Sequence, residues 1–303
     1  MRGSILTLSS LPPEEVARRL ADHGLNITIG PFDVSLRSKV PQVIRGVTHM
    51  YADHPISPVG EFIDFHINLF SPSLLRRWFR PQVNFAFDGA LPFKPLPMAQ
   101  GFAMFEWGLN WVVANHAHQF AIVHAAAVEK DGRGFIFPGA PGSGKSTLCA
   151  GLVSRGWRLL SDEMAMISLN DGLIWPIPRP VSLKNASIEI IRKFGADVVM
   201  GDVVADTAKG NLAHMRPPKA SVASAKTPAQ PFAIVFPTYR TNTETDYAEI
   251  SKGHTLMRLA ENCFNYPVLG AAGFNCLADA VEQSHCSTLT YSDMNDAISV
   301  LER

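Results

Sequence analysis

The segment between residues 134 and 154 constrains the fold more than any other part of the sequence. Its centre reads Gly139-Ala140-Pro141-Gly142-Ser143-Gly144-Lys145-Ser146-Thr147. An apolar run at residues 134–137 precedes this glycine-rich stretch, and a segment of helical character at residues 146–154 follows it. A strand, a glycine-rich turn and a helix in this order are the context of the phosphate-binding pattern G-x-x-x-x-G-K-[ST]. The sequence therefore predicts a βα unit whose turn binds an anion.

The residue types in this turn suit a nucleoside triphosphate. The backbone N–H groups of such a loop surround the phosphates, Lys145 reaches the β- and γ-phosphates, and the Ser146 hydroxyl ligates Mg²⁺. The N-terminal end of the following helix adds a positive dipole to the same place. ATP and Mg²⁺ are therefore the expected ligands, although the sequence does not distinguish ATP from GTP or pyrophosphate.

Two acidic residues follow the next expected strand. The helix ends near Gly156, and residues 157–160 form an apolar run that leads to Asp162 and Glu163. Parallel strands of a βαβ unit end at the same edge of the sheet, so we expect both carboxylates beside the triphosphate. Two carboxylates in that position can hold Mg²⁺, and one can accept the proton of an attacking hydroxyl group.

Three segments together resemble a known family. They are His124 in the run Val-His-Ala-Ala-Ala, the glycine-rich loop, and the run Arg-Gly-Trp-Arg-Leu-Leu-Ser-Asp-Glu at residues 155–163. The chain resembles the kinase domain of HPr kinase/phosphorylase and, more closely, the HPr-kinase-related proteins called kinase A, whose fold is related to phosphoenolpyruvate carboxykinase. The resemblance covers roughly residues 119–303, and the spacing from loop to acids is more specific than the loop alone. It implies an α/β P-loop kinase domain of that type.

The resemblance also implies roles for individual residues. Lys145 and Ser146 would serve the phosphates and the metal. Asp162 would be the base that activates the acceptor hydroxyl, and Glu163 would help to hold Mg²⁺ where the bifunctional enzymes carry a second Asp. His124 would lie at the rim of the phosphate site, although from the sequence alone it could equally be a histidine of the core.

The chain departs from the bifunctional enzymes in two places. Pro141 stands where their loop usually carries Ser, and residues 181–195 contain no counterpart of their downstream signature. We therefore do not carry over the phosphorylase activity or HPr as the substrate. The expected reaction is transfer of the γ-phosphoryl group of ATP to a hydroxyl group, on either a small hydroxy-metabolite or a Ser of a protein or peptide.

Two other functions fit the same motifs. One is a nucleotide-binding regulatory protein with little turnover, which would signal through its N-terminal domain. The other is a plain ATPase without a preferred acceptor. Substitution of Asp162 separates the first of these from a kinase, because only a transferase needs that carboxylate for turnover.

Composition restricts the partners and the location. The 27 basic and 27 acidic residues cancel, which argues against nucleic-acid binding. The sequence contains no apolar run long enough for a transmembrane helix and no cysteine pair with metal-site spacing, so the four cysteines are expected to be single buried thiols. A cytoplasmic protein is expected. The oligomeric state stays open, and a homo-oligomer is one of the states allowed.

A chain of 303 residues is expected to form two domains. Residues 1–98 read as a smaller β-rich α+β domain that could recognise the acceptor, and residues 99–303 read as the kinase domain. The proline cluster at residues 92–97 marks the expected boundary, and a helix at residues 100–115 is expected to pack against the kinase sheet. A helix is expected to begin after Ser10, and extended runs are expected at residues 26–29, 32–36, 43–51, 61–69 and 82–87.

One further segment is expected to lie near the site. Residues 201–230 are rich in Ala, Lys, Pro and Ser and read as a long loop or lid. Arg179, Arg216 and Lys219 are candidates for holding an anionic acceptor or the transferring phosphoryl group. Each of them alone is more often a solvated surface charge.

Overall fold

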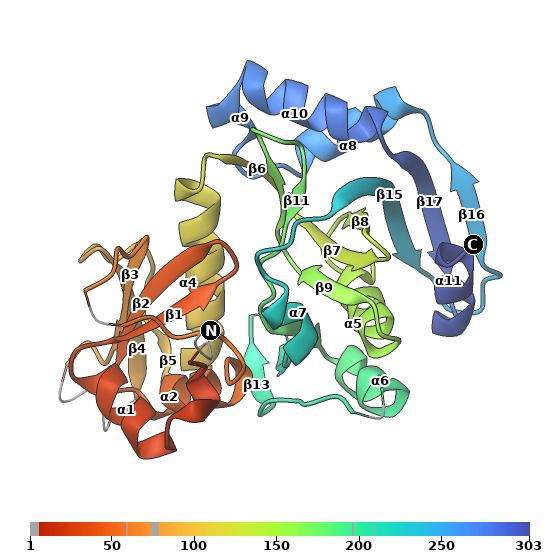
Figure 1. Cartoon of the computed structure of the whole chain (residues 1–303). Helices are drawn as coiled ribbons and strands as arrows, with labels where there is room; N and C mark the ends of the chain where they lie inside the picture. Colours follow the sequence, from red (N-terminus) through yellow and green to blue (C-terminus); the bar gives the residue numbers. More distant parts are fainter. Residues whose placement is uncertain (1–5, 59, 74–78, 196, 209) are drawn as a thin grey trace.

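The computed structural model describes residues 6–58, 60–73, 79–195, 197–208 and 210–303. These residues form a mixed α/β fold with several mixed sheets. Figure 1 shows two connected parts, which we call the N-terminal part (residues 6–116) and the C-terminal part (residues 117–303), with helix α4 (Gly101–His116) lying between their sheets.

A five-stranded sheet forms the centre of the N-terminal part, with the strand order β1-β2-β3-β4-β5. The pair β2/β3 is parallel and the other pairs are antiparallel. The elements are η1 (Leu8–Ser10), α1 (Pro13–Ala21), β1 (Leu25–Ile29), β2 (Phe32–Ser38), α2 (Pro41–Met50), β3 (Phe65–Phe70), β4 (Gln82–Phe87), β5 (Leu96–Pro97) and η2 (Met98–Gln100). Buried and half-buried residues alternate along β1, as the period of a strand requires.

The expectation of a strand at residues 43–51 is wrong, because these residues form most of helix α2. Its buried residues are Val43, Val47 and Met50, which recur at the spacing of one helix face. Pro41 occupies the start of the helix, where its fixed φ angle is favourable. The β-branched residues favoured a strand, and the burial of one helical face outweighed that preference. The expected strand at 61–69 begins only at Phe65.

Helix α4 packs mainly on the N-terminal part, and it also shares a buried core with Phe120, Ile122 and Met166 of the C-terminal part, so that expectation is met only in part. Two glycines permit the close approach: a Cβ atom at Gly46 of α2 would lie 2.3 Å from the Phe102 ring, and one at Gly108 would lie 2.1 Å from the Phe85 ring. The same buried core continues past the expected boundary at residue 98 to Met164 and other residues of the C-terminal part. Where the two domains divide stays a prediction.

The C-terminal part is built on a six-stranded sheet with the order β16-β17-β15-β8-β7-β9. Its remaining strands form two three-stranded sheets, β11-β10-β6 and β12-β14-β13. The elements are β6 (Phe120–Val123), β7 (Ala125–Lys130), β8 (Arg133–Pro138), α5 (Lys145–Ser154), β9 (Arg158–Ser161), β10 (Ala165–Ser168), β11 (Ile174–Trp175), β12 (Val181–Lys184), α6 (Ala186–Phe194), β13 (Val204–Thr207), β14 (Gly210–Met215), α7 (Lys219–Ala223), β15 (Gln230–Tyr239), β16 (Asp246–Glu249), α8 (Lys252–Glu261), α9 (Tyr266–Leu269), α10 (Ala271–Glu282), β17 (His285–Tyr291) and α11 (Met294–Leu301).

Both faces of the six-stranded sheet are covered by helices. Phe135 and Phe137 of β8 point to the core shared with α5 and α11, and Ile136 between them points to the core shared with α8 and α10. Figure 1 shows α8, α9 and α10 on one side of the sheet and α5 on the other. Burial on both faces explains why β8 reads as a continuous apolar run.

The expected long loop at residues 201–230 is instead folded into β13, β14 and α7. Strand β14 pairs antiparallel with β12 from Val181↔Met215 to Lys184↔Leu212. Leu212, Ala213 and Met215 are buried in this small sheet. The strands are short and two prolines follow them. The apolar residues of this segment therefore show no strand periodicity in the sequence.

Strand directions bring the two predicted segments to one edge. β8 and β9 are both antiparallel to β7, which lies between them, so they run in the same direction. β15 is parallel to β8, and β17 is parallel to β15. All four strands therefore end at one edge, which we call the loop edge. The prediction that the glycine-rich loop and the acidic pair share an edge is confirmed.

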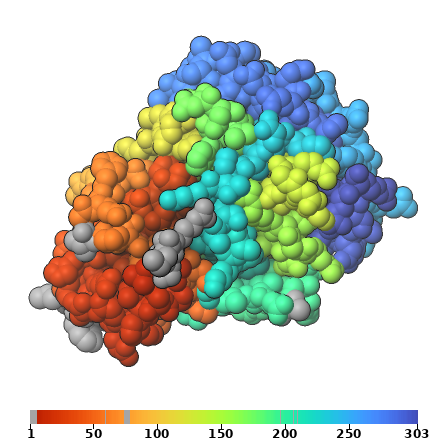
Figure 2. All heavy atoms as spheres, in the orientation of Figure 1, coloured from red at the N-terminus to blue at the C-terminus, as the bar shows by residue number. Residues whose placement is uncertain are grey.

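The two parts of the chain are in contact along an extended surface (Figure 2). Across this surface Arg216 forms an ion pair with Asp53, with 2.5 Å between Nη2 and Oδ2. The His54 ring bonds to the carbonyl oxygen of Pro178 at 3.0 Å. Within the described ranges, no helix is long and apolar enough to cross a membrane. All four cysteines are buried and free, as expected.

Candidate active site

The glycine-rich loop connects β8 to α5 in a conformation that needs its glycines. Gly139, Gly142 and Gly144 have φ angles of 152°, 86° and 98°. Gly144 is also the residue that caps the N-terminus of α5. Residues with a Cβ atom are strained at such φ angles. The backbone path of the loop therefore explains why these three positions are glycines.

Two tyrosines hold the loop from the neighbouring strands. The backbone N–H of Tyr239 donates to the Ser143 carbonyl oxygen at 3.0 Å. The Tyr291 hydroxyl donates to the Gly144 carbonyl oxygen at 3.4 Å. Their rings meet edge to face, with 5.7 Å between centroids. The loop is therefore fixed by the ends of β15 and β17 as well as by its own turn.

Lys145 lies under the loop with 7% of its surface exposed. Its Nζ donates to the carbonyl oxygens of Gly139 at 2.5 Å and Ala140 at 3.0 Å. Burial lowers the pKa of this ammonium, and the charges of Asp162 and Glu163 oppose that shift. The lysine and both carboxylates thus lie close enough to influence one another, as the sequence predicted.

Asp162 is a buried acid of the site with a strongly raised pKa. Its Oδ2 accepts a hydrogen bond from the backbone N–H of Ser182 at 2.9 Å, whereas Oδ1 is buried without a well-formed hydrogen bond from a described residue. Burial, and next the charge of Glu163, raise the pKa of Asp162 from 3.8 to about 7. The nearby Ser146 hydroxyl acts in the opposite direction. A buried acid with a raised pKa and one oxygen without a well-formed hydrogen bond is suited to take up a proton.

Glu163 is half-buried and lies against helix α4. Its Oε2 accepts a hydrogen bond from Nδ2 of Asn110 at 2.5 Å. The charge of Glu163 also raises the pKa values of Lys145 and Asp162. Glu163 therefore connects the loop edge with the N-terminal part.

Arg179 is buried and already engaged with helix α4. Its Nη2 donates to Oε2 and to the carbonyl oxygen of Glu106, each at 2.7 Å, and its Nη1 donates to Oδ1 of Asn110. The guanidinium charge is therefore balanced by the Glu106 carboxylate. An anionic acceptor would have to compete with that carboxylate, which weakens the predicted role of Arg179.

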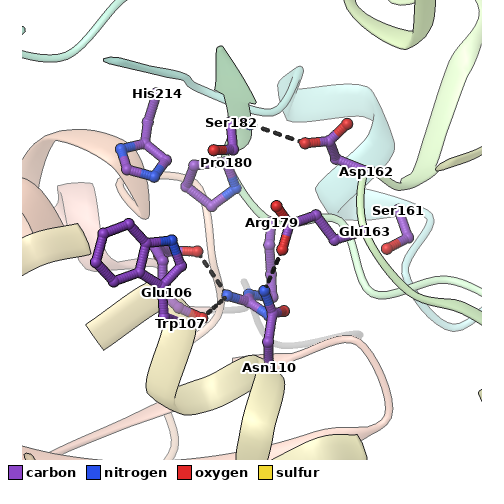
Figure 3. A pocket seen from close by; sticks show the side chains of 10 residues that line it. All are labelled: Glu106, Trp107, Asn110, Ser161, Asp162, Glu163, Arg179, Pro180, Ser182 and His214. Carbon is purple, nitrogen blue, oxygen red and sulfur yellow. Dashed lines mark hydrogen bonds and ion pairs between the residues drawn. The ribbon is translucent and has the colours of Figure 1, made fainter. Parts of the chain in front are cut away.

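A small pocket lies between helix α4 and the C-terminal part (Figure 3). Its cavity volume of about 20 Å³ is close to that of a single water site. The residues that line it are Glu106, Trp107, Asn110, Ser161, Asp162, Glu163, Arg179, Pro180, Ser182 and His214. The narrow cavity admits the tip of a molecule and not a whole metabolite.

Several polar atoms of this pocket are buried and lack a hydrogen-bond partner among the described residues. They are Asp162 Oδ1, Arg179 Nε, Ser182 Oγ and His214 Nε2. Burial lowers the pKa of His214 to about 4, so its ring is neutral near pH 7. Buried polar groups without partners are rare and costly in a folded protein, so these four atoms make the pocket a candidate ligand site.

The other predicted residues lie outside the pocket. Arg216 is bonded to Asp53, as described above, and Lys219 is exposed at the start of α7. His124 lies at the loop edge, since the next residue pairs with Pro138 at the end of β8. Its ring packs on Phe264, with 5.3 Å between centroids. The proposed substrate roles of Arg216 and Lys219 gain no support from this placement.

The sequence interpretation missed Glu106, Asn110, Ser182 and His214. Helix α4 did carry a signal, because Glu106 and Asn110 lie four positions apart in an otherwise mostly apolar helix and so share one face. The polar pair on a buried helix could have been recognised as part of a site. Ser182 and His214 gave no such signal, because they lie in short strands whose pairing only the fold reveals.

The loop and the acids fit a magnesium ion better than a metal held by protein alone. Among the described residues, no three His, Cys, Asp or Glu side chains are grouped so that they could hold a metal ion. Mg²⁺ usually takes one or two carboxylates and completes its shell with phosphates and water. Ser146, Asp162 and Glu163 are such a set.

Neither a protein-family model nor a curated protein matches this chain.

Proposed function

We propose that the protein is an ATP- and Mg²⁺-dependent kinase that transfers the γ-phosphoryl group to a hydroxyl acceptor. The observation that carries this proposal is Asp162, a buried carboxylate beside the phosphate-binding loop that lines the pocket and whose Oδ1 has no well-formed hydrogen bond from a described residue. The strand-loop-helix unit and the acids at the same edge support a kinase domain of the HPr kinase and phosphoenolpyruvate carboxykinase type. The free buried thiols agree with a cytoplasmic location, where ATP is plentiful.

The residues of the loop edge would bind and orient the donor. The N–H groups of the loop and the N-terminus of α5 would surround the β- and γ-phosphates. Lys145 would exchange the carbonyl oxygens of Gly139 and Ala140 for phosphate oxygens. Mg²⁺, held by Ser146, Asp162 and Glu163, would neutralise charge on the phosphates.

The pocket would receive the acceptor hydroxyl. Asp162 Oδ1 takes the hydroxyl proton, the acceptor oxygen forms a bond to the γ-phosphorus, and the bond from that phosphorus to the β-phosphate oxygen breaks. ADP leaves with the electron pair of that bond. Because the cavity is small, the acceptor inserts a hydroxyl-bearing tip, and the rest of the molecule stays outside. Positioning and electrostatics supply nearly all of the rate enhancement in such a reaction.

The decisive experiment compares wild type with Asp162→Asn, using γ-labelled ATP, Mg²⁺ and a cell extract divided into metabolite and protein fractions. We expect label in one acceptor with wild type, and a loss of about 10²–10⁴-fold with Asp162→Asn while ATP binding is kept. Asp171→Asn is the matched control, because Asp171 lies in an exposed turn between β10 and β11.

Three outcomes separate the candidate functions. Label that Asp162→Asn abolishes and Asp171→Asn does not would support the kinase. ATP binding without any labelled acceptor would favour the regulatory protein. Steady phosphate release into water in every fraction would favour a plain ATPase.

A further inference from the structure

Helix α4 brings a side chain of the N-terminal part into direct contact with an acid of the loop edge. The contact is the hydrogen bond from Asn110 Nδ2 to Glu163 Oε2, at 2.5 Å (Figure 3). We propose that Asn110 is a positioning residue for Glu163, so that the N-terminal part completes the metal-binding half of the site. This inference rests on the proposed kinase function, because that function gives Glu163 its role with Mg²⁺.

The orientation of the Asn110 amide follows from its two neighbours. Arg179 can only donate hydrogen bonds and an ionised carboxylate can only accept them. Oδ1 of Asn110 therefore faces Arg179, and Nδ2 must face Glu163. The amide cannot be reversed without placing a donor against a donor and an acceptor against an acceptor.

The residues behind Asn110 are fixed as well. Arg179 is held by the carboxylate and the carbonyl oxygen of Glu106. The other oxygen of that carboxylate accepts a hydrogen bond from the Tyr51 hydroxyl at 2.6 Å. Tyr51, Glu106 and Arg179 are buried, and hydrogen bonds are stronger where water is excluded. The result is one chain of contacts from the end of α2 to Glu163.

This chain has a consequence for metal binding. A glutamate side chain is flexible, and a ligand that must first be ordered binds its metal less tightly. Asn110 holds Oε2 of Glu163, so the carboxylate is ordered before it meets a cation. Partners of this kind, one bond removed from a metal, typically contribute 10–100-fold to its affinity.

The test measures Mn²⁺ binding in the presence of ADP by electron paramagnetic resonance, which does not depend on turnover. We expect Asn110→Ala to weaken Mn²⁺ binding by about tenfold. Asn115→Ala is the matched control, since Asn115 lies on the same helix, is exposed, and donates to the Trp111 carbonyl oxygen of its own helix. In a Glu163→Gln background, Asn110→Ala should have no further effect, because the residue acts through Glu163.

Two further measurements exclude a merely structural effect. Asn110→Ala should raise the Mg²⁺ concentration needed for half-maximal transfer by about tenfold, whereas Asn115→Ala should leave it unchanged. Asn110→Asp keeps the oxygen that faces Arg179 and removes the donor that faces Glu163, so it should also weaken Mn²⁺ binding in a folded protein.

The results that would overturn the inference differ from those that would overturn the kinase. If Glu163→Gln weakens Mn²⁺ binding and Asn110→Ala does not, or if Asn110→Asp binds more tightly than wild type, Asn110 is not a positioning residue and the kinase stands. If wild type binds no Mn²⁺–ADP and Lys145→Ala changes nothing, the proposed function itself fails.

Discussion

The two sides of the candidate site are held in place by different kinds of structure. On the loop side, one continuous segment supplies backbone groups, and the positions of three glycines and two tyrosine contacts fix its shape. On the pocket side, long buried side chains from α4, from residues 176–180 and from β14 meet one another. The shape of the loop side depends on the backbone conformation at a few positions. The stability of the pocket side depends on buried charges, which balance one another only while every partner is present.

The largest effect is expected from breaking the charge balance on the pocket side. Arg179→Met leaves the buried Glu106 carboxylate without its ion-pair partner, and loss of one member of a buried pair costs about 3–5 kcal/mol of unfolding free energy. Denaturation with urea measures this loss. The double variant Glu106→Gln/Arg179→Met should recover part of it, because no uncompensated charge remains.

A surface pair provides the control for that measurement. Arg192 and Glu189 form an ion pair of the same length on the exposed face of α6. Arg192→Met should cost no more than about 0.5 kcal/mol. Equal costs at the two arginines would contradict the view that buried charges hold the pocket side together.

An intermediate effect is expected from the backbone on the loop side. Gly144→Ala places a Cβ at a φ angle of 98° and 2.9 Å from the Tyr291 hydroxyl oxygen, so we expect a loss of about 1–3 kcal/mol. Calorimetric titration should show weaker ATP binding as well. Gly253→Ala in α8 meets no neighbouring atom, and it should be stabilising by about 0.5–1 kcal/mol. If both substitutions change the unfolding free energy in the same direction, the backbone conformation of Gly144 is not what stabilises the loop.

The smallest effect concerns the pH dependence of the pocket side. Burial lowers the pKa of His54 from 6.5 to about 4, so the folded protein binds fewer protons there than the unfolded chain does between these values. This contribution to stability is present above pH 6.5 and is lost as the pH falls toward 4. His54→Gln keeps a donor for the Pro178 carbonyl oxygen and removes the titration.

The measurement is the difference in unfolding free energy between His54→Gln and wild type. As the pH falls from 6.5 to 5.5, the unfolding free energy of the variant relative to wild type should rise by about 1 kcal/mol. The similar titration of His214 is present in both proteins and cancels. A difference that does not change with pH would show that His54 is not held neutral by its burial.

The same contrast explains how much the sequence could predict. The loop, its strand and helix, and the acids after β9 were predictable, because each is encoded within a short segment and parallel strands end together. The pocket side was not, because Asn110, Arg179 and His214 come together only through α4, residues 176–180 and the pairing of β14 with β12. The helix at Pro41–Met50 was misread for a related reason: its β-branched residues favour strands locally, and only its packing decides.

The anchoring of the loop by Tyr239 and Tyr291 has a consequence for how the protein is made. The loop occupies residues 139–147, yet two of its hydrogen-bond partners, Tyr239 and Tyr291, come from strands that are synthesised much later. During translation these two contacts can form only after residue 291 has left the ribosome. On the proposed function, ATP would therefore bind only the completed chain, and the N-terminal sheet would persist without help from the nucleotide until β17 is in place.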